Sequence, residues 1–113
     1  MEYIKKPLTN KEIANLNKKY GDYLKITADI GREELVAGCS LHADGEKILL
    51  AKGSKQEFIW GGGINLKTGE IDCLAVLNLR PANGNPGMEI IDPQKREKFI
   101  KTVKKIFHSL WEK

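Results

Sequence analysis

The feature that most restricts the fold is a pair of segments with alternating hydrophobicity, joined by a very short turn. Residues 23–30 and residues 35–41 each place an apolar side chain at every second position. In a β-strand every second side chain points to the same face, so each segment predicts a strand with one apolar face. Gly31-Arg32-Glu33 between them is too short for a crossover, so the strands are antiparallel. The expected core face of this hairpin comprises Leu24, Ile26, Ala28, Ile30, Leu35, Ala37, Cys39 and Leu41.

A helix over residues 10–20 is predicted by the signals at its two ends. Thr9 and Glu12 have the spacing of a capping box, in which each side chain bonds to the backbone N–H of the other residue. Gly21 follows the last apolar residue of the helical pattern and can end the helix in the left-handed conformation.

The segment after the hairpin predicts two short helical pieces. Asp44 is placed to cap a helix that ends at Gly53, and Ser54-Lys55-Gln56-Glu57 has the spacing of another capping box, before a turn that includes Trp60. Gly61-Gly62-Gly63 lacks the Gly-Lys-Ser/Thr ending of a phosphate-binding loop, so we interpret it as a connector that stops this turn.

Residues 71–80 form the most apolar strand candidate. A turn at 67–70 joins them to the short segment 64–66, as in a hairpin. Apolar residues occur on both faces in the middle of 71–80, which is typical of a strand that is covered on both sides. We therefore expect a central strand here.

The last helix starts at Asp92 and Pro93, an N-cap side chain followed by a first-turn proline. Residues 93–113 contain seven Lys or Arg against two Glu, so the net charge of +4 comes from this helix. Its apolar stripe is formed by Phe99, Ile100, Val103, Ile106, Phe107, Leu110 and Trp111. Its basic face is formed by Lys98, Lys101, Lys104 and Lys105. Such a face either meets solvent and the helix dipole or contacts nucleic-acid phosphates. The aromatic residues lie in the apolar stripe, which favours the solvated interpretation.

These elements predict an α+β fold with the order α-β-β-α-α-β-β-α and a mainly antiparallel four-stranded sheet packed by helices. A chain of 113 residues is expected to form a single domain, residues 1–113. It has neither the ~18-residue apolar run of a membrane span nor the apolar segment of a secretion signal, which predicts a cytoplasmic protein. Cys39 and Cys73 lack paired spacing and are expected to be buried thiols.

The strongest site candidate follows the predicted strand 71–80. Asn78 and Arg80 share one strand face, and Asn83 and Asn85 lie just beyond, between prolines and glycines. A guanidinium with nearby carboxamides suits a carboxylate, a phosphate or a nucleotide edge. The alternative is structural: the asparagines build turns, and Arg80 bonds backbone carbonyls or a local acid such as Asp92.

Three further residues are candidates for the opposite wall of this site. Lys55 and Gln56 stand at the start of a predicted helical turn, where free backbone amides attract anions. His42 ends the predicted second strand and is either a hydrogen-bonded structural residue or a general base. The second histidine, His108, maps to the solvent side of the last helix, so we expect neither a metal nor a cofactor.

Several motifs resemble a family of small bacterial and archaeal proteins catalogued as a domain of unknown function. They are His42-Ala43-Asp44, Gly53-Ser54-Lys55-Gln56, Trp60-Gly61, Asn78-Leu79-Arg80-Pro81, Gly84-Asn85 and Asp92-Pro93. The resemblance covers most of the chain and is densest from residue 42 to residue 93. It implies one domain and a common surface for the motif residues, and it implies no reaction, cofactor or partner.

Three functions follow as hypotheses. The first is binding of a small, anionic ligand at the end of strand 71–80. The second is a non-enzymatic homodimeric or partner-interaction module, in which exposed aromatic residues such as Trp60 or Trp111 are buried by the partner. The third is nucleic-acid binding through the basic last helix, and no membrane partner is expected.

Overall fold

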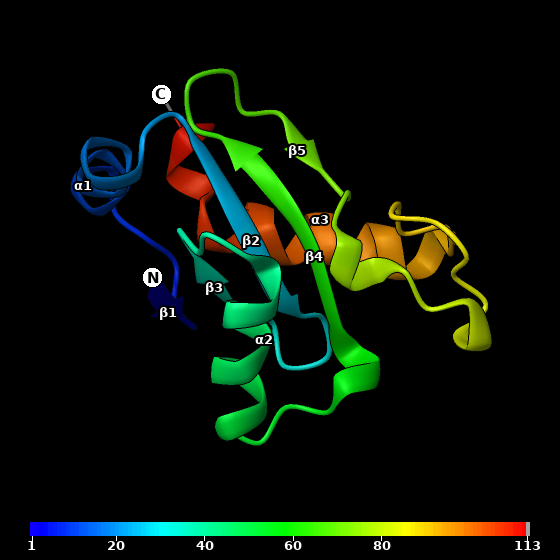
Figure 1. The fold of residues 1–113 in the computed structure, drawn as a ribbon. Helices are drawn as coiled ribbons and strands as arrows, with labels where there is room; N and C mark the ends of the chain where they lie inside the picture. Colours follow the sequence, from blue (N-terminus) through cyan, green and yellow to red (C-terminus); the bar gives the residue numbers. More distant parts are fainter. Residues whose placement is uncertain (113) are drawn as a thin grey trace.

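The computed structural model describes residues 1–112 and confirms the α+β class. The described strands form one sheet in the order β1-β3-β2-β4-β5, and each neighbouring pair is antiparallel (Figure 1). The strands are β1 (Glu2–Ile4), β2 (Tyr23–Asp29), β3 (Glu34–Ala37), β4 (Ile59–Asn65) and β5 (Ile71–Asp72). The predicted hairpin is confirmed, because Asp29 lies opposite Glu34 and Ile26 opposite Ala37.

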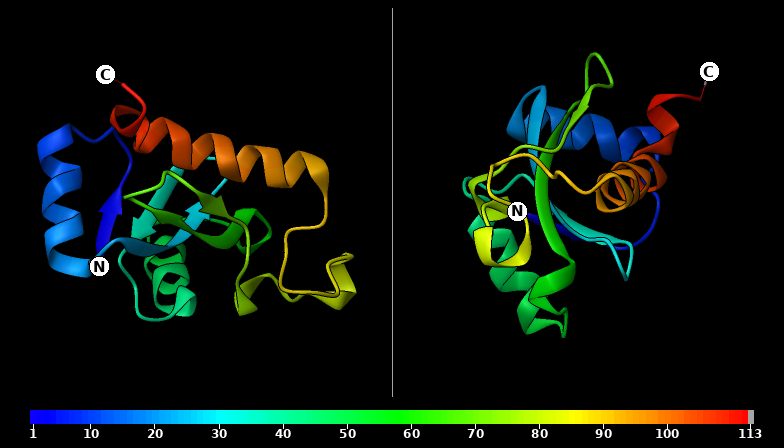
Figure 2. Two further views of the ribbon diagram at one scale, coloured as in Figure 1. Left: turned by 90° about the horizontal axis from the view of Figure 1, so that it is seen from above. Right: turned by 90° about the vertical axis from the view of Figure 1, so that its right-hand side faces the viewer.

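Two helices sandwich the sheet, and a third stands beside its β1 edge. In Figure 2, α2 (His42–Ala51) and α3 (Pro93–Ile106) lie on opposite faces of the sheet, and α1 (Asn10–Tyr20) lies beside β1. Four short 3-10 turns complete the described elements: η1 (Gln56–Phe58), η2 (Val76–Asn78), η3 (Pro81–Asn83) and η4 (His108–Leu110). Both predicted long helices are confirmed, including the capping box of Thr9 with Glu12 and the Asp92 cap.

The core has two parts because the sheet is covered on both faces. The larger part lies between the sheet and helices α1 and α3, where Phe99, Val103 and Ile106 are fully buried. A smaller cluster of Val36, Leu49 and Ile59 lies under α2. Cys39 and Cys73 are buried free thiols, as expected. Among residues 1–112, no helix has the length and apolar composition needed to cross a membrane.

The interpretation of the triple glycine as a connector was wrong, because Gly61, Gly62 and Gly63 form the middle of β4. A Cβ atom at Gly61 would lie 2.6 Å from Ala75 Cβ and 2.9 Å from His42 Cδ2, and one at Gly62 would lie 2.7 Å from Phe99 Cε1. Glycine weakens a strand unless other groups approach closely, and here they approach from both faces. Close packing against the strand therefore explains the three glycines.

The prediction of a central strand over residues 71–80 was also wrong. β5 consists of two residues at the edge of the sheet, and the central strands are β2 and β4. The apolar residues on both faces of 71–80 suggested a strand covered on both sides. In the structure Leu74 and Val76 are 48% and 71% exposed, so the second apolar face is not covered. The chain leaves the sheet after Asp72, whose Oδ1 accepts a hydrogen bond from Leu74 N at 3.1 Å.

The capping predictions between residues 42 and 58 were wrong as well. α2 starts at His42 with Leu41 as N-cap, and Asp44 lies inside the first turn. The turn after Gly53 is the 3-10 turn η1, and the buried Ser54 hydroxyl has no hydrogen-bond partner among residues 1–112 instead of capping it. Trp60 belongs to β4 and is 2% exposed.

Two further differences alter the predicted element order. The sheet has a fifth strand, β1, which was not predicted. Its three residues are too few to show a clear alternation in the sequence. The second hairpin strand ends at Ala37, because Gly38 adopts a positive φ of 79° and breaks the alternation. As a result Leu41, expected on the core face, is 61% exposed.

Candidate ligand-binding site

Asn78 is fully buried and completes the edge of β4 instead of facing a ligand. Its Oδ1 accepts from Gly61 N, and its Nδ2 donates to Gly61 O, both at 2.8 Å. The same Nδ2 lies 3.2 Å from Cys73 O and 3.0 Å from Met88 O. The short strand β5 ends opposite Gly63, so the Asn78 amide takes the place of the next strand residue. Its hydrogen-bonding groups are all used within the fold.

Asn85 has the same kind of role in the loop of residues 76–91, called here the asparagine loop. It is 3% exposed, and its Nδ2 donates to Asn78 O at 2.7 Å, Glu89 O at 2.8 Å and Gly87 O at 3.0 Å. Its Oδ1 accepts from Ile91 N at 3.0 Å. One side chain therefore holds the two ends of the loop together.

Arg80 bonds backbone carbonyls, which agrees with the structural alternative. Its guanidinium donates to the carbonyls of Leu77 at 3.3 Å, Gln56 at 3.1 Å and Ile59. Its Cζ lies 4.4 Å from the centre of the Trp60 ring. Burial lowers the pKa of Arg80. Asp92, the acid considered as a partner, caps α3 instead.

Other predicted residues meet Arg80 through the backbone, since Asn83 N donates to Arg80 O at 3.0 Å and Arg80 N donates to Asn85 O at 2.7 Å. Asn83 and Lys55 are exposed, and the Gln56 amide lies 3.5 Å from the Glu46 carboxylate. Gln56 meets Arg80 only through its backbone carbonyl. A single ligand site formed by the seven predicted residues therefore stays a prediction.

His42 is the predicted residue that does line a cavity. This space of about 390 Å³, called here the His42 cavity, is bounded by Lys25, Leu41, His42, Ala43, Val76 and Leu77. The His42 ring packs against Gly61, and its Nε2 lies 2.7 Å from Gly62 O. A carbonyl only accepts, so Nε2 carries the proton, and in the neutral ring Nδ1 is an acceptor. Burial is the main cause that lowers the pKa of His42, and it favours the neutral ring.

The close approach of α2 to the sheet holds His42 in this position. Gly45 faces Thr27, where a Cβ atom would lie only 2.8 Å from the Thr27 side chain. The buried Thr27 hydroxyl donates to His42 O at 2.9 Å, which fixes the first turn of the helix. Glycines on the helix and on β4 thus allow the imidazole to enter between them.

The His42 cavity also lies at the uncapped N-terminus of a ten-residue helix. Leu41 at the N-cap makes no side-chain hydrogen bond to the first turn. The helix dipole makes such an end attractive to anions, although Asp44 N already donates to Leu41 O at 3.0 Å. Lys25, whose Nζ donates to Ser40 O at 2.7 Å, is the charged residue of the lining. The lining contains no carboxylate among residues 1–112.

A second polar pair lies beside the cavity on the same face of the sheet. Tyr23 packs over Gly63, and its hydroxyl donates to Asp72 Oδ2 at 2.8 Å. Partial desolvation of the hydroxyl and this hydrogen bond raise the pKa of Tyr23. The Asp72 carboxylate also acts on His42 in the sense that raises its pKa, against the effect of burial.

Lys25 and Tyr23 were not among the predicted site residues. The sequence pattern that could have identified them is the polar face of the first hairpin strand, Tyr23-x-Lys25-x-Thr27-x-Asp29. The alternation of polar and apolar residues predicts that this face meets solvent. In the fold α2 covers part of this face, and Thr27 and Asp29 are 0% and 1% exposed. Polar residues on a covered face were therefore the informative pattern.

Other candidate features are placed as follows. Lys98, Lys101 and Lys104 are exposed on α3, and Lys105 pairs with Glu33 at 3.3 Å. Nucleic-acid binding through this basic face stays a prediction. Trp60 is buried and unavailable to a partner, whereas Trp111 is 43% exposed. Within residues 1–112 no three His, Cys, Asp or Glu side chains are grouped to hold a metal ion.

The fold and the His42 cavity define a small α+β domain with an open antiparallel sheet and, at the start of α2, a mostly apolar pocket that contains Lys25 and His42. The chain belongs to the family described as "Protein of unknown function (DUF5674)", whose model matches residues 2–106. The resemblance carried by the sequence motifs is thereby confirmed. No curated protein and no solved structure matches the chain.

Proposed function

We propose that this protein binds a small organic anion in the His42 cavity. The observation that carries the proposal is the position of His42, half-buried on Gly62 O, beside Lys25 and at the open end of α2. The proposal keeps the ligand class inferred from the sequence and moves the site from Arg80 and the asparagines to the His42 cavity, which the loop lines with Val76 and Leu77.

Two groups in the cavity favour a negative charge, and a third, His42, can bond to a neutral polar group of the same ligand. Lys25 contributes a full positive charge with two ammonium protons beyond the one bonded to Ser40 O. The first turn of α2 contributes the positive end of the helix dipole, although Asp44 in that turn is acidic and its N–H donates to Leu41 O at 3.0 Å. Neutral His42 contributes Nδ1 as an acceptor for an O–H or N–H of the ligand.

The rest of the lining favours an apolar body on the same ligand. Leu41 and Val76 are 61% and 71% exposed, and Leu77 and Ala43 complete the wall. Pockets for small molecules combine apolar walls with a few polar groups that fix orientation. A carboxylate or phosphate on a short aliphatic or aromatic group has this chemistry.

The test is a titration with inorganic phosphate, butyrate, benzoate and adenosine monophosphate, followed by amide and imidazole resonances in NMR and by thermal shift. We expect butyrate or benzoate to shift the signals of Lys25, His42 and Val76 and to raise the melting temperature, since a ligand of the native state stabilises it. Lys25→Met removes the charge and keeps the aliphatic stem, so it abolishes these shifts.

Lys101→Met is the matched control, because Lys101 is an exposed lysine on α3 away from the cavity. Ala43→Trp fills the cavity without altering Lys25 or His42 and prevents binding independently. The proposal fails if every probe leaves the His42 and Lys25 signals unchanged, or if Lys25→Met and Lys101→Met weaken binding equally.

A further inference from the structure

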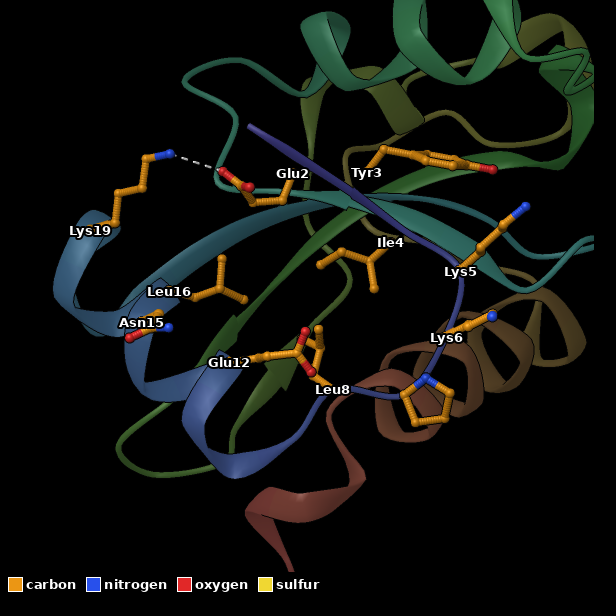
Figure 3. Close-up of a pocket in the computed structure, with 11 residues that line it drawn as sticks. Glu2, Tyr3, Ile4, Lys5, Lys6, Leu8, Glu12, Asn15, Leu16 and Lys19 are labelled. Atoms are coloured by element: carbon orange, nitrogen blue, oxygen red, sulfur yellow. Dashed lines mark hydrogen bonds and ion pairs between the residues drawn. The ribbon is translucent and has the colours of Figure 1, made fainter.

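A second cavity lies between β1 and α1, away from His42. It has a volume of about 480 Å³ and is lined by the whole of residues 2–8 and by one face of α1: Glu12, Asn15, Leu16 and Lys19. In Figure 3 the side chains of Ile4, Leu8 and Leu16 lie between the ribbon of β1 and the helix. An edge strand thus runs along a groove with an apolar floor and a helical wall.

The outer edge of β1 presents unpaired backbone groups. Gly38 N donates to Lys25 O, so the alternate residues of β3, including Leu35, direct their backbone groups toward β1. Leu35 lies opposite Ile4, so the N–H and C=O of Ile4 face β3. Those of Tyr3 then point away from the sheet.

The same edge continues past the end of the strand. Lys5 and Lys6 form no backbone hydrogen bond within residues 1–112. The unpaired segment ends at Leu8, whose N–H donates to Ile106 O at 2.8 Å. Tyr3 and Lys5 therefore offer the alternate donors and acceptors to which an added strand bonds.

The charged residues that line this groove, Lys5, Lys6 and Lys19 against Glu2 and Glu12, leave it with a net positive charge. Glu2 is held by the Tyr20 hydroxyl and by Lys19, and these two contacts lower the pKa of Glu2. Glu12 Oε1 accepts from Thr9 N at 3.0 Å as part of the capping box. Lys5 and Lys6 make no ion pair with residues 1–112. An acidic segment complements this remaining charge.

We propose that β1 and α1 form a peptide-binding groove, in which an extended acidic segment of a partner protein pairs with β1 as an added strand. Its backbone bonds to Tyr3 and Lys5, one apolar side chain packs on Ile4, Leu8 and Leu16, and a carboxylate lies near Lys5 and Lys6. Main-chain bonds supply affinity in such strand addition, and the pockets for alternate side chains supply specificity. This inference is independent of the His42 cavity.

The experiment selects a random peptide library displayed on phage against the full chain, and then titrates the enriched peptides as synthetic, end-capped molecules. We expect sequences that alternate acidic and apolar residues. Their binding should shift the amide signals of Tyr3 and Lys5 and protect these amides from hydrogen exchange.

Lys5→Pro is the decisive variant, since proline removes an outward N–H and is tolerated at a strand edge. Affinity should fall about tenfold, the scale of one lost hydrogen bond, at an unchanged melting temperature. Lys5→Gln with Lys6→Gln should weaken binding and reduce its salt dependence, whereas the control Lys11→Gln with Lys18→Gln on the outer side of α1 should not.

Asn15→Trp narrows the groove from the helix side and provides a second block that leaves β1 intact. The proposal is overturned if no peptide is enriched over an unrelated protein, or if the perturbed signals map to the His42 cavity or to α3. It is also overturned if sedimentation shows that a second copy occupies the groove, as a dimer that Lys5→Pro dissociates.

Discussion

The asparagine loop and the His42 cavity meet at η2, which belongs to the loop and lines the cavity with Val76 and Leu77. Both contain polar groups, yet these groups are used in opposite ways. Asn78 and Asn85 make four hydrogen bonds each through their amides, all to backbone atoms of the same chain. His42 Nε2 donates to Gly62 O, which leaves Nδ1 as an unused acceptor. The Lys25 ammonium group donates one hydrogen bond, to Ser40 O, and has two further N–H donors for a ligand.

The difference teaches that polar residue types do not mark a site by themselves. Buried polar groups need partners, and a loop without regular structure obtains them from its own side chains. Unused hydrogen-bonding capacity beside a cavity is the better indicator of a ligand. The following predictions test whether the loop is structural and whether the cavity is open, beginning with the strand that supports both.

The largest effect is expected for Gly62→Ala. A Cβ atom at this position would meet the Asp72 carbonyl and lie 2.7 Å from Phe99 Cε1, and the backbone contact cannot be relieved by a rotamer change. We expect a loss of more than about 4 kcal/mol in the free energy of unfolding, or failure to fold. Urea denaturation measures it.

Gly87→Ala is the matched control for that change. A Cβ atom at Gly87 would meet no heavy atom within 4 Å, and Gly87 does not adopt a positive φ. Its stability should therefore stay within about 0.5 kcal/mol of the unaltered protein. Equal losses for the two variants would show that the close approach to β4 is not what requires the glycines.

Asn78→Ala should be the next most destabilising change. It leaves the N–H and C=O of Gly61 without their side-chain partner at a buried strand edge. The expected cost is about 3 kcal/mol in the free energy of unfolding. Asn83→Ala, an exposed asparagine of the same loop, should cost less than about 0.5 kcal/mol. If Asn78→Ala retained full stability and lost ligand binding, the assignment of the two regions would be reversed.

The sequence was informative where local chemistry decides the structure. The capping box of Thr9 and the Asp92-Pro93 helix start depend on near neighbours, and both were predicted correctly. The hairpin predicted over 23–30 and 35–41 was correct as far as Ala37. The α+β class followed from these elements.

The failures share a different cause, which is contact between segments distant in sequence. The glycines of β4 are explained by Phe99, His42 and Tyr23, none of which is adjacent in the chain. Asn78 completes a strand 17 residues away. The candidate site could be predicted only through His42, because Lys25 reaches the cavity by the pairing of β2 with β4 and by the packing of α2.

A smaller loss of stability is expected for Arg80→Lys, a variant that tests whether the role of Arg80 is structural. A lysine keeps the charge but cannot reach three carbonyls in different directions or stack its planar group on Trp60. We expect a loss of about 1–2 kcal/mol in the free energy of unfolding. Anion binding in the NMR titration should be unchanged once the variant is folded, and a selective loss of binding would instead restore Arg80 as the anion anchor.

The smallest effect concerns pH and separates His42 from an ordinary surface histidine. Burial lowers the pKa of His42 below the ordinary value of about 6.5, so the unfolded chain binds the proton more tightly than the folded chain. Its contribution to stability is complete above about pH 6.5 and is lost as the pH falls from there through the lowered pKa of the folded state.

His42→Gln supplies the comparison, because a glutamine amide can donate to Gly62 O without titrating. Urea unfolding at pH 7.5 and at pH 5.5 should therefore show a larger acid-induced loss for the unaltered protein than for His42→Gln. Saturating anion in the cavity should raise the pKa of His42 by stabilising the imidazolium, which shrinks the difference between the two proteins. A pH dependence that is identical with and without His42 would mean that the ring is freely solvated and that the cavity does not hold it in the neutral state.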